Sequence, residues 1–358
     1  MTPLGRQIAS RIRLAGPMGL DEYMRLCLLH PEHGYYATRD PFGAAGDFTT
    51  APEISQMFGE MIGLALAQAW LDQGSPAPFT LAEIGPGRGT LMADILRVIA
   101  RVPGMTEAAE VTLIEASPHL RGVQARRLGA ISHLDAATDL PERPLFLVAN
   151  EFFDALPIRQ FQRAAAGWAE RVVALDAQGA LTLGLVARDD APGLPPAAHL
   201  PTGTVLETCP EALPIAHAIA SRIARHGGAA ILIDYGNWNG QGDSFQALRQ
   251  HRPEDPLAHP GEADLTAHVD FAPLAAVARQ AGARVSAMLP QGDWLLRLGI
   301  AARAQRLAKA GDAGAMAALH RLTAPGEMGQ LFKTLAFWAP TAPVPPGFDA
   351  LDPDADHA

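Results

Sequence analysis

Residues whose types and spacing could support chemistry cluster in one stretch, Glu83-Ile84-Gly85-Pro86-Gly87-Arg88-Gly89-Thr90. An apolar, strand-like run ends in an acid, three glycines follow at alternate positions, and a helical pattern begins at Thr90. Glycines at such a turn let the backbone bend sharply and let a bulky ligand lie against bare main chain. The N-terminus of the following helix offers free N–H groups to an anionic group. The stretch therefore predicts a nucleotide-type cofactor site that includes Glu83, Gly85, Gly87 and Gly89, with a glycine turn that binds no ligand as the alternative.

The spacing of the glycines narrows the choice of nucleotide. A dinucleotide fingerprint places its third glycine three residues after the second, whereas here Gly89 comes two residues after Gly87. A P-loop is excluded because no Lys-Ser or Lys-Thr pair ends the motif. The next strand-like run, 111–115, ends in Glu115, whose carboxylate can accept both hydroxyls of a ribose. Nicotinamide and S-adenosylmethionine sites both use such an acid, so the residues alone leave the two open.

Polar residues also follow two later strand-like runs. Asn150, Glu151 and Asp154 come after the run 145–149, and Asp234 ends the run 229–234. In an open α/β sheet, ligands bind outside the carboxyl ends of the strands. Glu151 and Asp154 could form a carboxylate pair, which is the preferred partner of a planar guanidinium group. Asn150 could reach the amino-acid end of a cofactor, and Asp234 could orient a substrate.

The same acids could instead have structural roles. Glu151 could cap a helix, Asp154 could pair with Arg159, and Asp234 could hold the turn above Gly236. Upstream, the segment 43–53 is too rich in small and polar residues to be core. It could close over the cofactor as a lid, with Asp47 and Thr49 as polar contacts. The plainer alternative is that Thr50 or Glu53 caps the next helix.

Composition and charge exclude several classes of protein. The balance of 28 basic and 38 acidic residues gives a net charge of −10, which argues against a broad nucleic-acid-binding face. The histidines show no paired ligand spacing, so no metal is expected, and no G-x-S-x-G elbow indicates a serine hydrolase. Two cysteines have no metal-ligand spacing and need no disulfide. Neither a secretory signal nor a transmembrane run is recognised, which predicts a cytoplasmic protein without membrane insertion.

Alternating strand and helix patterns predict an α/β fold with a mainly parallel sheet and helices on both faces. The expected organisation has four parts. Residues 1–74 form an N-terminal helical segment with the lid loop, and residues 75–290 form the core with an antiparallel insertion near 158–187. Residues 291–340 form a C-terminal helical segment, with the helical pattern extending to about Trp338, and residues 341–358 form a flexible tail.

Taken in order, the motifs resemble those of one family. Beyond the glycine motif, the segments that carry the resemblance are 34–36, 40–43, 46–56, 115–118, 149–157, 233–236, 261–271 and 328–333. The chain resembles, over roughly residues 16–338, the class I S-adenosylmethionine-dependent methyltransferases that include the mitochondrial complex I assembly protein-arginine methyltransferases, the MidA family. One departure is Gly236-Asn237-Trp238, where a histidine is expected after the glycine.

This resemblance implies a class I methyltransferase (Rossmann-like) fold, S-adenosyl-L-methionine as cofactor, and a protein substrate. In eukaryotic relatives, which are mitochondrial, it implies arginine methylation on the 49-kDa-type subunit of respiratory complex I. Carried onto this chain, the glycines and Glu115 would hold the cofactor, and the blocks 47–53 and 150–154 would complete the pocket. A small-molecule methyltransferase and a cofactor-binding assembly factor remain alternatives. The sequence predicts neither the oligomeric state nor the identity of the methyl acceptor.

Overall fold

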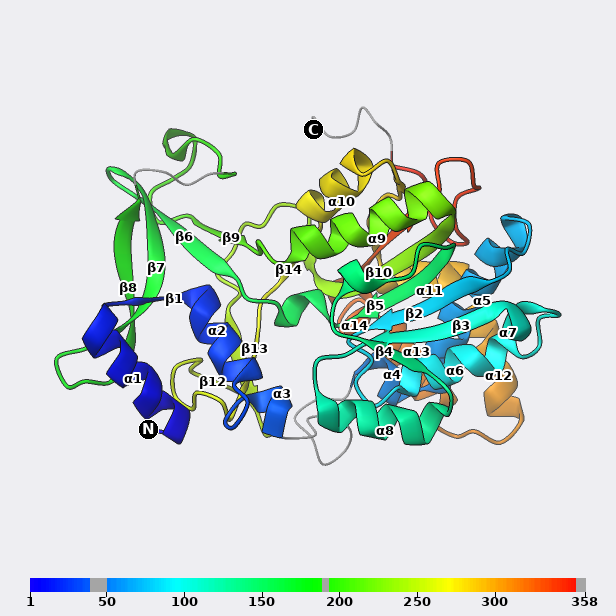
Figure 1. Ribbon diagram of the computed structural model, residues 1–358, viewed down its shortest axis with the longest axis horizontal. Coiled ribbons are helices and arrows are strands. Elements are labelled where there is room, and N and C mark those ends of the chain that lie inside the picture. Colours follow the sequence, from blue (N-terminus) through cyan, green and yellow to red (C-terminus); the bar gives the residue numbers. More distant parts are fainter. Residues whose placement is uncertain (39–49, 189–192, 352–358) are drawn as a thin grey trace. The chain divides into compact units, whose positions relative to one another are not determined.

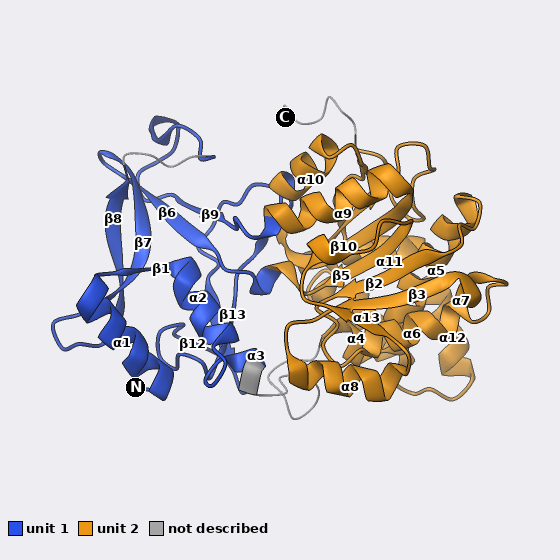
Figure 2. Cartoon of the chain, in the orientation of Figure 1, with its two compact units in different colours: residues 1–48, 154–212, 237–272 blue, residues 49–153, 213–236, 273–358 orange. Residues whose placement is uncertain are grey.

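The structure is a computed structural model that describes residues 1–38, 50–188 and 193–351. Contacts within the chain divide it into two compact units, shown in different colours in Figure 2. Unit 1 comprises Met1–Phe48, Asp154–Ala212 and Asn237–Ala272, and unit 2 comprises Thr49–Phe153, Leu213–Gly236 and Pro273–Ala358. Each unit is therefore built from three separate stretches of chain.

Unit 2 contains a central sheet with the strand order β15-β17-β10-β5-β2-β3-β4. Strands β4, β3, β2, β5 and β10 are parallel neighbours, whereas β17 runs antiparallel to β10. The strand order reverses around β2, so a switch point lies where β2 and its neighbour β5 end. The strands are β2 (Phe79–Ile84), β3 (Ala109–Ile114), β4 (Ser132–Leu134), β5 (Leu145–Asn150), β10 (Gly228–Asn237), β15 (Arg284–Val285), β16 (Leu289–Pro290) and β17 (Phe332–Trp338).

Helices cover both faces of this sheet (Figure 1). On one face, α5 and α6 bury their apolar side chains against strand residues such as Phe146 and Val148. The helices are α4 (Ala51–Ile54), α5 (Gln56–Asp72), α6 (Thr90–Ile99), α7 (Met105–Ala108), α8 (Pro118–Leu128), α9 (Ala212–His226), α10 (Phe271–Gln280), α11 (Gln291–Arg297), α12 (Ile300–Lys309), α13 (Ala315–Thr323) and α14 (Met328–Leu331). Short 3₁₀ turns lie at Ala137–Asp139 in unit 2, at Phe153–Ala155 across the unit boundary and at Ala197–His199 in unit 1. The predicted α/β class with a mainly parallel sheet is confirmed.

Close packing of α5 on α6 fixes the helix that follows the glycine motif. A Cβ atom added at Gly59 of α5 would lie 2.5 Å from the Cβ atom of Asp94 on α6. Only glycine permits this approach, because any other side chain would force the two helices apart. The N-terminus of α6, and with it the turn that leads from β2, is held firmly against the core.

Unit 1 is built on antiparallel strands and three N-terminal helices. Its larger sheet has the order β1-β7-β6-β9, with β8 pairing with β7, and a smaller sheet has the order β12-β11-β13. The region 158–187, where an antiparallel insertion is predicted, contains β6, β7 and most of β8. The elements are α1 (Pro3–Ala15), β1 (Met18–Gly19), α2 (Leu20–Leu29), α3 (Tyr35–Thr38), β6 (Arg159–Ala164), β7 (Gly167–Leu175), β8 (Leu181–Arg188), β9 (Val205–Thr208), β11 (Gln246–Arg249), β12 (Arg252–Glu254), β13 (Asp264–Thr266) and β14 (Val269–Asp270).

The unit boundaries differ from the predicted division at 74, 290 and 340. Helices α1 and α2 belong to unit 1, whereas α4 and α5 belong to unit 2, so the expected segment 1–74 is split. The apolar faces of α1 and α2 pack in one cluster with Val173 and Leu265. Helical periodicity predicts an apolar face but does not say which distant segment covers it.

Two predictions for the C-terminal region are wrong. The helical pattern ends at α14, and Phe332–Trp338 forms β17, which pairs along seven residues with β10. The predicted flexible tail is packed over its first part, because Phe348 is 5% exposed and its ring packs at a tilt against that of Trp294, with ring centroids 5.2 Å apart. Burial of aromatic side chains against partners distant in sequence overrides the local alanine-rich and proline-rich patterns.

Candidate active site

The glycine turn lies between β2 and α6, at the carboxyl end of β2, the neighbour of the middle strand β5. Gly85, Gly87 and Gly89 have φ values of 65°, 50° and 74°, a region that side chains other than glycine rarely adopt. A Cβ atom added at Gly85 would also lie 2.9 Å from Cδ2 of Phe152. The structure therefore places all three predicted glycines in one turn, in which the N–H groups of Gly85 and Gly89 donate to the carbonyls of Ile114 and Pro86 at 3.1 and 2.7 Å.

Glu83 lies one residue before the end of β2 and is 3% exposed. The pKa of Glu83 is raised to about 8, mainly by burial; a hydrogen bond from the backbone of Met92 opposes the shift, and the charges of Asp94 and Glu115 add to it. Its Oε2 atom is buried and has no hydrogen-bond partner in the part of the chain that the structure describes. A buried acceptor of this kind is costly unless a ligand supplies a donor.

Asn150 ends the neighbouring strand β5 and is 7% exposed. Its Nδ2 atom donates to Oε1 of Glu151 at 3.1 Å, while its buried Oδ1 atom has no partner among the described residues. Glu83 pairs in register with Val148, so Asn150, two residues further along β5, faces the same side of the sheet. Two buried acceptors on one face beside the glycine turn fit a cationic donor such as an amino-acid ammonium group, which S-adenosylmethionine carries.

Glu115 directly follows β3 and is partly buried. Its Oε1 atom accepts from the backbone N–H of Ser117 at 2.8 Å, and its Oε2 atom accepts from Nε2 of Gln124 at 3.2 Å. Burial raises the pKa of Glu115, although both hydrogen bonds favour the charged form. Ser117 also caps α8, with Pro118 in the first turn. The carboxylate is thus held in place at the strand end that suits a ribose.

Glu151 occupies the first position after β5 and has a φ of 50°, which is uncommon for a residue with a side chain. Its N–H donates to the carbonyl of Ile233 at 2.9 Å. Its Oε1 atom accepts from Asn150 and from the backbone N–H of Ala51, at 3.1 and 3.2 Å. Ala51 is the first residue of α4, so Glu151 does cap a helix, although one that lies far away in the sequence. Strained backbone of this kind accumulates at functional sites.

Asp234 on β10 is 1% exposed and holds the turn after β5. Its Oδ2 atom accepts from the backbone N–H groups of Phe152 and Phe153 at 3.1 and 3.0 Å, and its Oδ1 atom accepts from that of Tyr235 at 2.9 Å. The carboxylate of Asp234 therefore positions the turn that carries Glu151. A direct part for Asp234 in catalysis stays a prediction.

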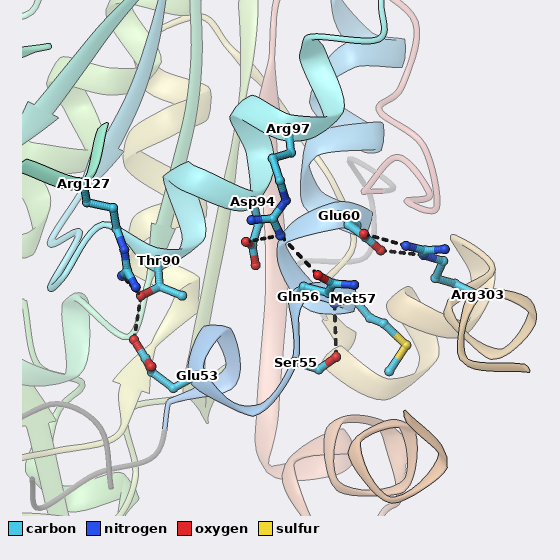
Figure 3. A network of polar contacts seen from close by, with 10 residues as sticks. All are labelled: Glu53, Ser55, Gln56, Met57, Glu60, Thr90, Asp94, Arg97, Arg127 and Arg303. Atoms are coloured by element: carbon cyan, nitrogen blue, oxygen red, sulfur yellow. Dashed lines mark hydrogen bonds and ion pairs between the residues drawn. The ribbon is translucent and has the colours of Figure 1, made fainter. Parts of the chain in front are cut away.

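Helix α4 contacts the first residue of α6 through Glu53 and Thr90, as Figure 3 shows. The Oε1 atom of Glu53 accepts from the hydroxyl of Thr90 at 2.6 Å, and Arg127 of α8 contacts the same hydroxyl. The sequence predicts for Glu53 either a capping role or a place in the pocket block 47–53, and its contact with Thr90, 37 residues away, is not predicted. The predicted contacts Asp47 and Thr49 lie outside the described residues.

Asp154 belongs to unit 1, where it is 7% exposed. Its carbonyl accepts from the backbone N–H of Ala267 at 3.0 Å. Nearby, the hydroxyl of Tyr36 donates to Oδ1 of Asp264 at 2.9 Å, and burial followed by the charges of Asp264 and Asp154 raises the pKa of Tyr36. Because Glu151 belongs to unit 2, the predicted pairing of Glu151 with Asp154 stays a prediction.

The described residues show neither a metal site nor a membrane-spanning helix. No group of three or more His, Cys, Asp or Glu side chains in residues 1–38, 50–188 and 193–351 has the arrangement of a metal site. Within the same ranges, no helix combines the length and the apolar character that crossing a membrane requires.

The strand order, the glycine turn and the strand-end acids together define an α/β methyltransferase that uses S-adenosyl-L-methionine. Residues 61–289 match a family described as "Putative S-adenosyl-L-methionine-dependent methyltransferase", and the chain belongs to that family. It is also similar in structure to a Burkholderia thailandensis protein crystallised with bound S-adenosyl-homocysteine. That pair has a TM-score of 0.83 and 30% identity, and the match covers 96% of this chain and 93% of the other.

The chain is also similar in sequence to mitochondrial proteins named as protein arginine methyltransferases. The chain is 36% identical over 370 residues to "Protein arginine methyltransferase NDUFAF7 homolog, mitochondrial" of Drosophila melanogaster, covering 94% of this chain and 84% of that protein. It is also 36% identical over 335 residues to the human protein named "Protein arginine methyltransferase NDUFAF7, mitochondrial", covering 85% and 75%. The resemblance predicted from the motifs, and the cofactor it implies, are thereby confirmed.

Proposed function

We propose that this protein transfers the methyl group of S-adenosyl-L-methionine to a guanidinium nitrogen of an arginine in a protein substrate. The names of the relatives support the choice of acceptor. The observation that carries the proposal for this chain is Glu151, a carboxylate kept at a φ of 50° beside the glycine turn. A carboxylate fixed at that position suits the capture of a planar, permanently charged guanidinium group.

When bound, the cofactor supplies an electrophilic methyl group on a sulfonium sulfur. Glu151 holds the guanidinium so that the lone pair of one nitrogen points at that methyl carbon, which is mainly a positioning task. The N–C bond forms as the S–C bond breaks, the bonding pair stays on sulfur, and the nitrogen then loses one proton to the carboxylate or to solvent. Asn150 and Ala51 orient the carboxylate through their hydrogen bonds, and Asp234 fixes the turn on which it lies.

The assignment of the other residues is part of the same proposal. Gly85, Gly87, Gly89, Glu83 and Asn150 would bind the amino-acid end of the cofactor, and Glu115 its ribose. Asp154 would add a second carboxylate for the acceptor. As substrate we propose a subunit of respiratory complex I, in keeping with the family resemblance, and specifically its 49-kDa-type subunit.

The test uses the pure protein, methyl-labelled S-adenosyl-L-methionine and a lysate of cells that lack the gene. Labelled proteins are separated and hydrolysed to amino acids. Label in methylated arginine, on a band that antibody or mass spectrometry identifies as the 49-kDa-type subunit, is the expected result. Label only in small molecules would replace the proposal with a small-molecule methyltransferase. Cofactor binding by calorimetry without any label would favour an assembly factor.

Replacing Glu115 by alanine is expected to weaken binding of S-adenosyl-homocysteine by about 10- to 100-fold. The ribose hydroxyls would lose a charged acceptor, and hydrogen bonds to charged groups contribute about 1.5–3 kcal/mol each. Isothermal calorimetry measures the change directly. Glu110→Ala is the matched control, because Glu110 lies on β3, the strand that Glu115 follows, and pairs with Arg143. An affinity equal to that of the wild type would remove Glu115 from the cofactor site.

A further inference from the structure

We propose that Gln124 is a positioning residue that fixes the glycine turn relative to the ribose-binding carboxylate. Gln124 lies on α8 and is 0% exposed. Its side chain connects three segments of unit 2: the β2–α6 turn, the end of β3, and strand β4. The inference rests on the proposed cofactor site and not on the identity of the methyl acceptor.

The side-chain amide of Gln124 forms three hydrogen bonds, two through its NH₂ group and one through its oxygen. Its Nε2 atom donates to the carbonyl of Gly87 at 2.7 Å and to Oε2 of Glu115 at 3.2 Å. Its Oε1 atom lies 2.8 Å from Nε2 of His133 on β4. Both predicted halves of the cofactor site, the glycine turn and the ribose acid, are therefore bound by a single NH₂ group.

The donors and acceptors allow only one orientation of this amide. A carbonyl and a carboxylate accept hydrogen bonds, so the NH₂ group must face Gly87 and Glu115. The Oε1 atom must then accept, and His133 donates to it from Nε2. A flipped amide would set an oxygen against two acceptors, which is unfavourable in a buried position. The network thus has one arrangement, which is the property that a precise binding site requires.

Packing around the glycine turn reinforces the same connection. A Cβ atom added at Gly89 would lie 3.0 Å from Cδ1 of Leu128 and 3.6 Å from Cγ of Gln124. Helix α8 therefore lies against the turn along one face. Gln124 binds Gly87 through its carbonyl, while the N–H groups of Gly85 and Gly89 donate to the backbone carbonyls of Ile114 and Pro86 at 3.1 and 2.7 Å, so the turn is held from several sides. Groups that hold the binding residues of a site in place commonly set its affinity without touching the ligand.

The experiment compares two buried glutamines. Gln124→Met preserves the length of the side chain and removes its hydrogen bonds. Gln291→Met is the matched control, because Gln291 is also 0% exposed but donates to the carbonyl of Leu322 on α13. Calorimetry with S-adenosyl-homocysteine is expected to give about tenfold or greater loss of affinity for Gln124→Met. The affinity of Gln291→Met is expected to stay within about twofold of the wild type.

A double-mutant cycle separates positioning from a general loss of stability. If Gln124 acts through Glu115, Gln124→Met combined with Glu115→Gln weakens binding by clearly less than the product of the two single effects. Independent effects that multiply, or an unchanged affinity in a folded Gln124→Met protein, would overturn the proposal. Thermal unfolding without ligand shows whether both variants fold. None of these measurements needs a methyl acceptor, so a failure of arginine methylation leaves their outcome unaffected.

Discussion

Replacing Glu151 by glutamine is expected to lower methyl transfer by at least about 100-fold while leaving the affinity for S-adenosyl-homocysteine within about twofold. Glutamine keeps an Oε1 acceptor for Asn150 and for the N–H of Ala51, so the turn and helix α4 stay in place. What is lost is the negative charge that holds and orients a guanidinium group. The loss therefore falls on the reaction and not on the binding of the cofactor.

The measurement combines a methylation assay on a verified arginine substrate with calorimetry. Glu60→Gln serves as the control, because the carboxylate of Glu60 makes two hydrogen bonds with Arg303 on α12, away from the β5 turn. We expect this variant to retain nearly full activity. Full turnover by Glu151→Gln would show that the acceptor is held by other groups. A large loss of cofactor affinity in the same variant would instead move Glu151 to the cofactor site.

Much of the cofactor side of the site could be predicted because its signals are local. The alternate glycines, the strand-end acid Glu115 and the Ser117-Pro118 helix start each lie within a few residues of the element that they mark. Carboxyl ends of parallel strands meet at one edge of a sheet, so one strand order places several predicted residues together. The alternating strand and helix patterns were enough to predict that sheet.

The parts that could not be predicted depend on partners distant in sequence. Gln124 looks like an ordinary helical residue until its three partners, 9 to 37 residues away, are known. Asp234 accepts from N–H groups 81 and 82 residues away, which gives its carboxylate a clear structural task. The division into two units has the same cause, because apolar faces on helices and strands do not identify the segment that covers them.

Replacing Glu83 by glutamine is expected to stabilise the protein without ligand, and the gain should grow as the pH rises from about 5 to about 8. The pKa of Glu83 is raised from 4.5 to about 8, mainly by burial, with Asp94 and Glu115 adding to the shift and the Met92 backbone opposing it. Between these values the folded wild type keeps a proton that the unfolded chain has lost. Its stability therefore falls with rising pH, by on the order of 1 kcal/mol per pH unit. Glutamine resembles the protonated form and avoids this loss.

The midpoint of thermal unfolding, measured for both proteins across this pH range, tests the expectation. Glu170→Gln provides a control in which stability should change with pH in the opposite direction. Burial raises the pKa of Glu170, but the hydrogen bonds from Arg159 and Arg188 have the larger effect, so the pKa is lowered overall. The wild type should therefore be more stable than Glu170→Gln above about pH 5, and that advantage should shrink as the pH falls. If the difference between wild type and Glu83→Gln is the same at pH 5 and pH 8, Glu83 is not the buried, protonated group inferred here. Such a pH-independent difference would mean that burial does not destabilise the ionised carboxyl of Glu83. It would therefore also weaken the case that a cationic ligand binds at its Oε2 atom.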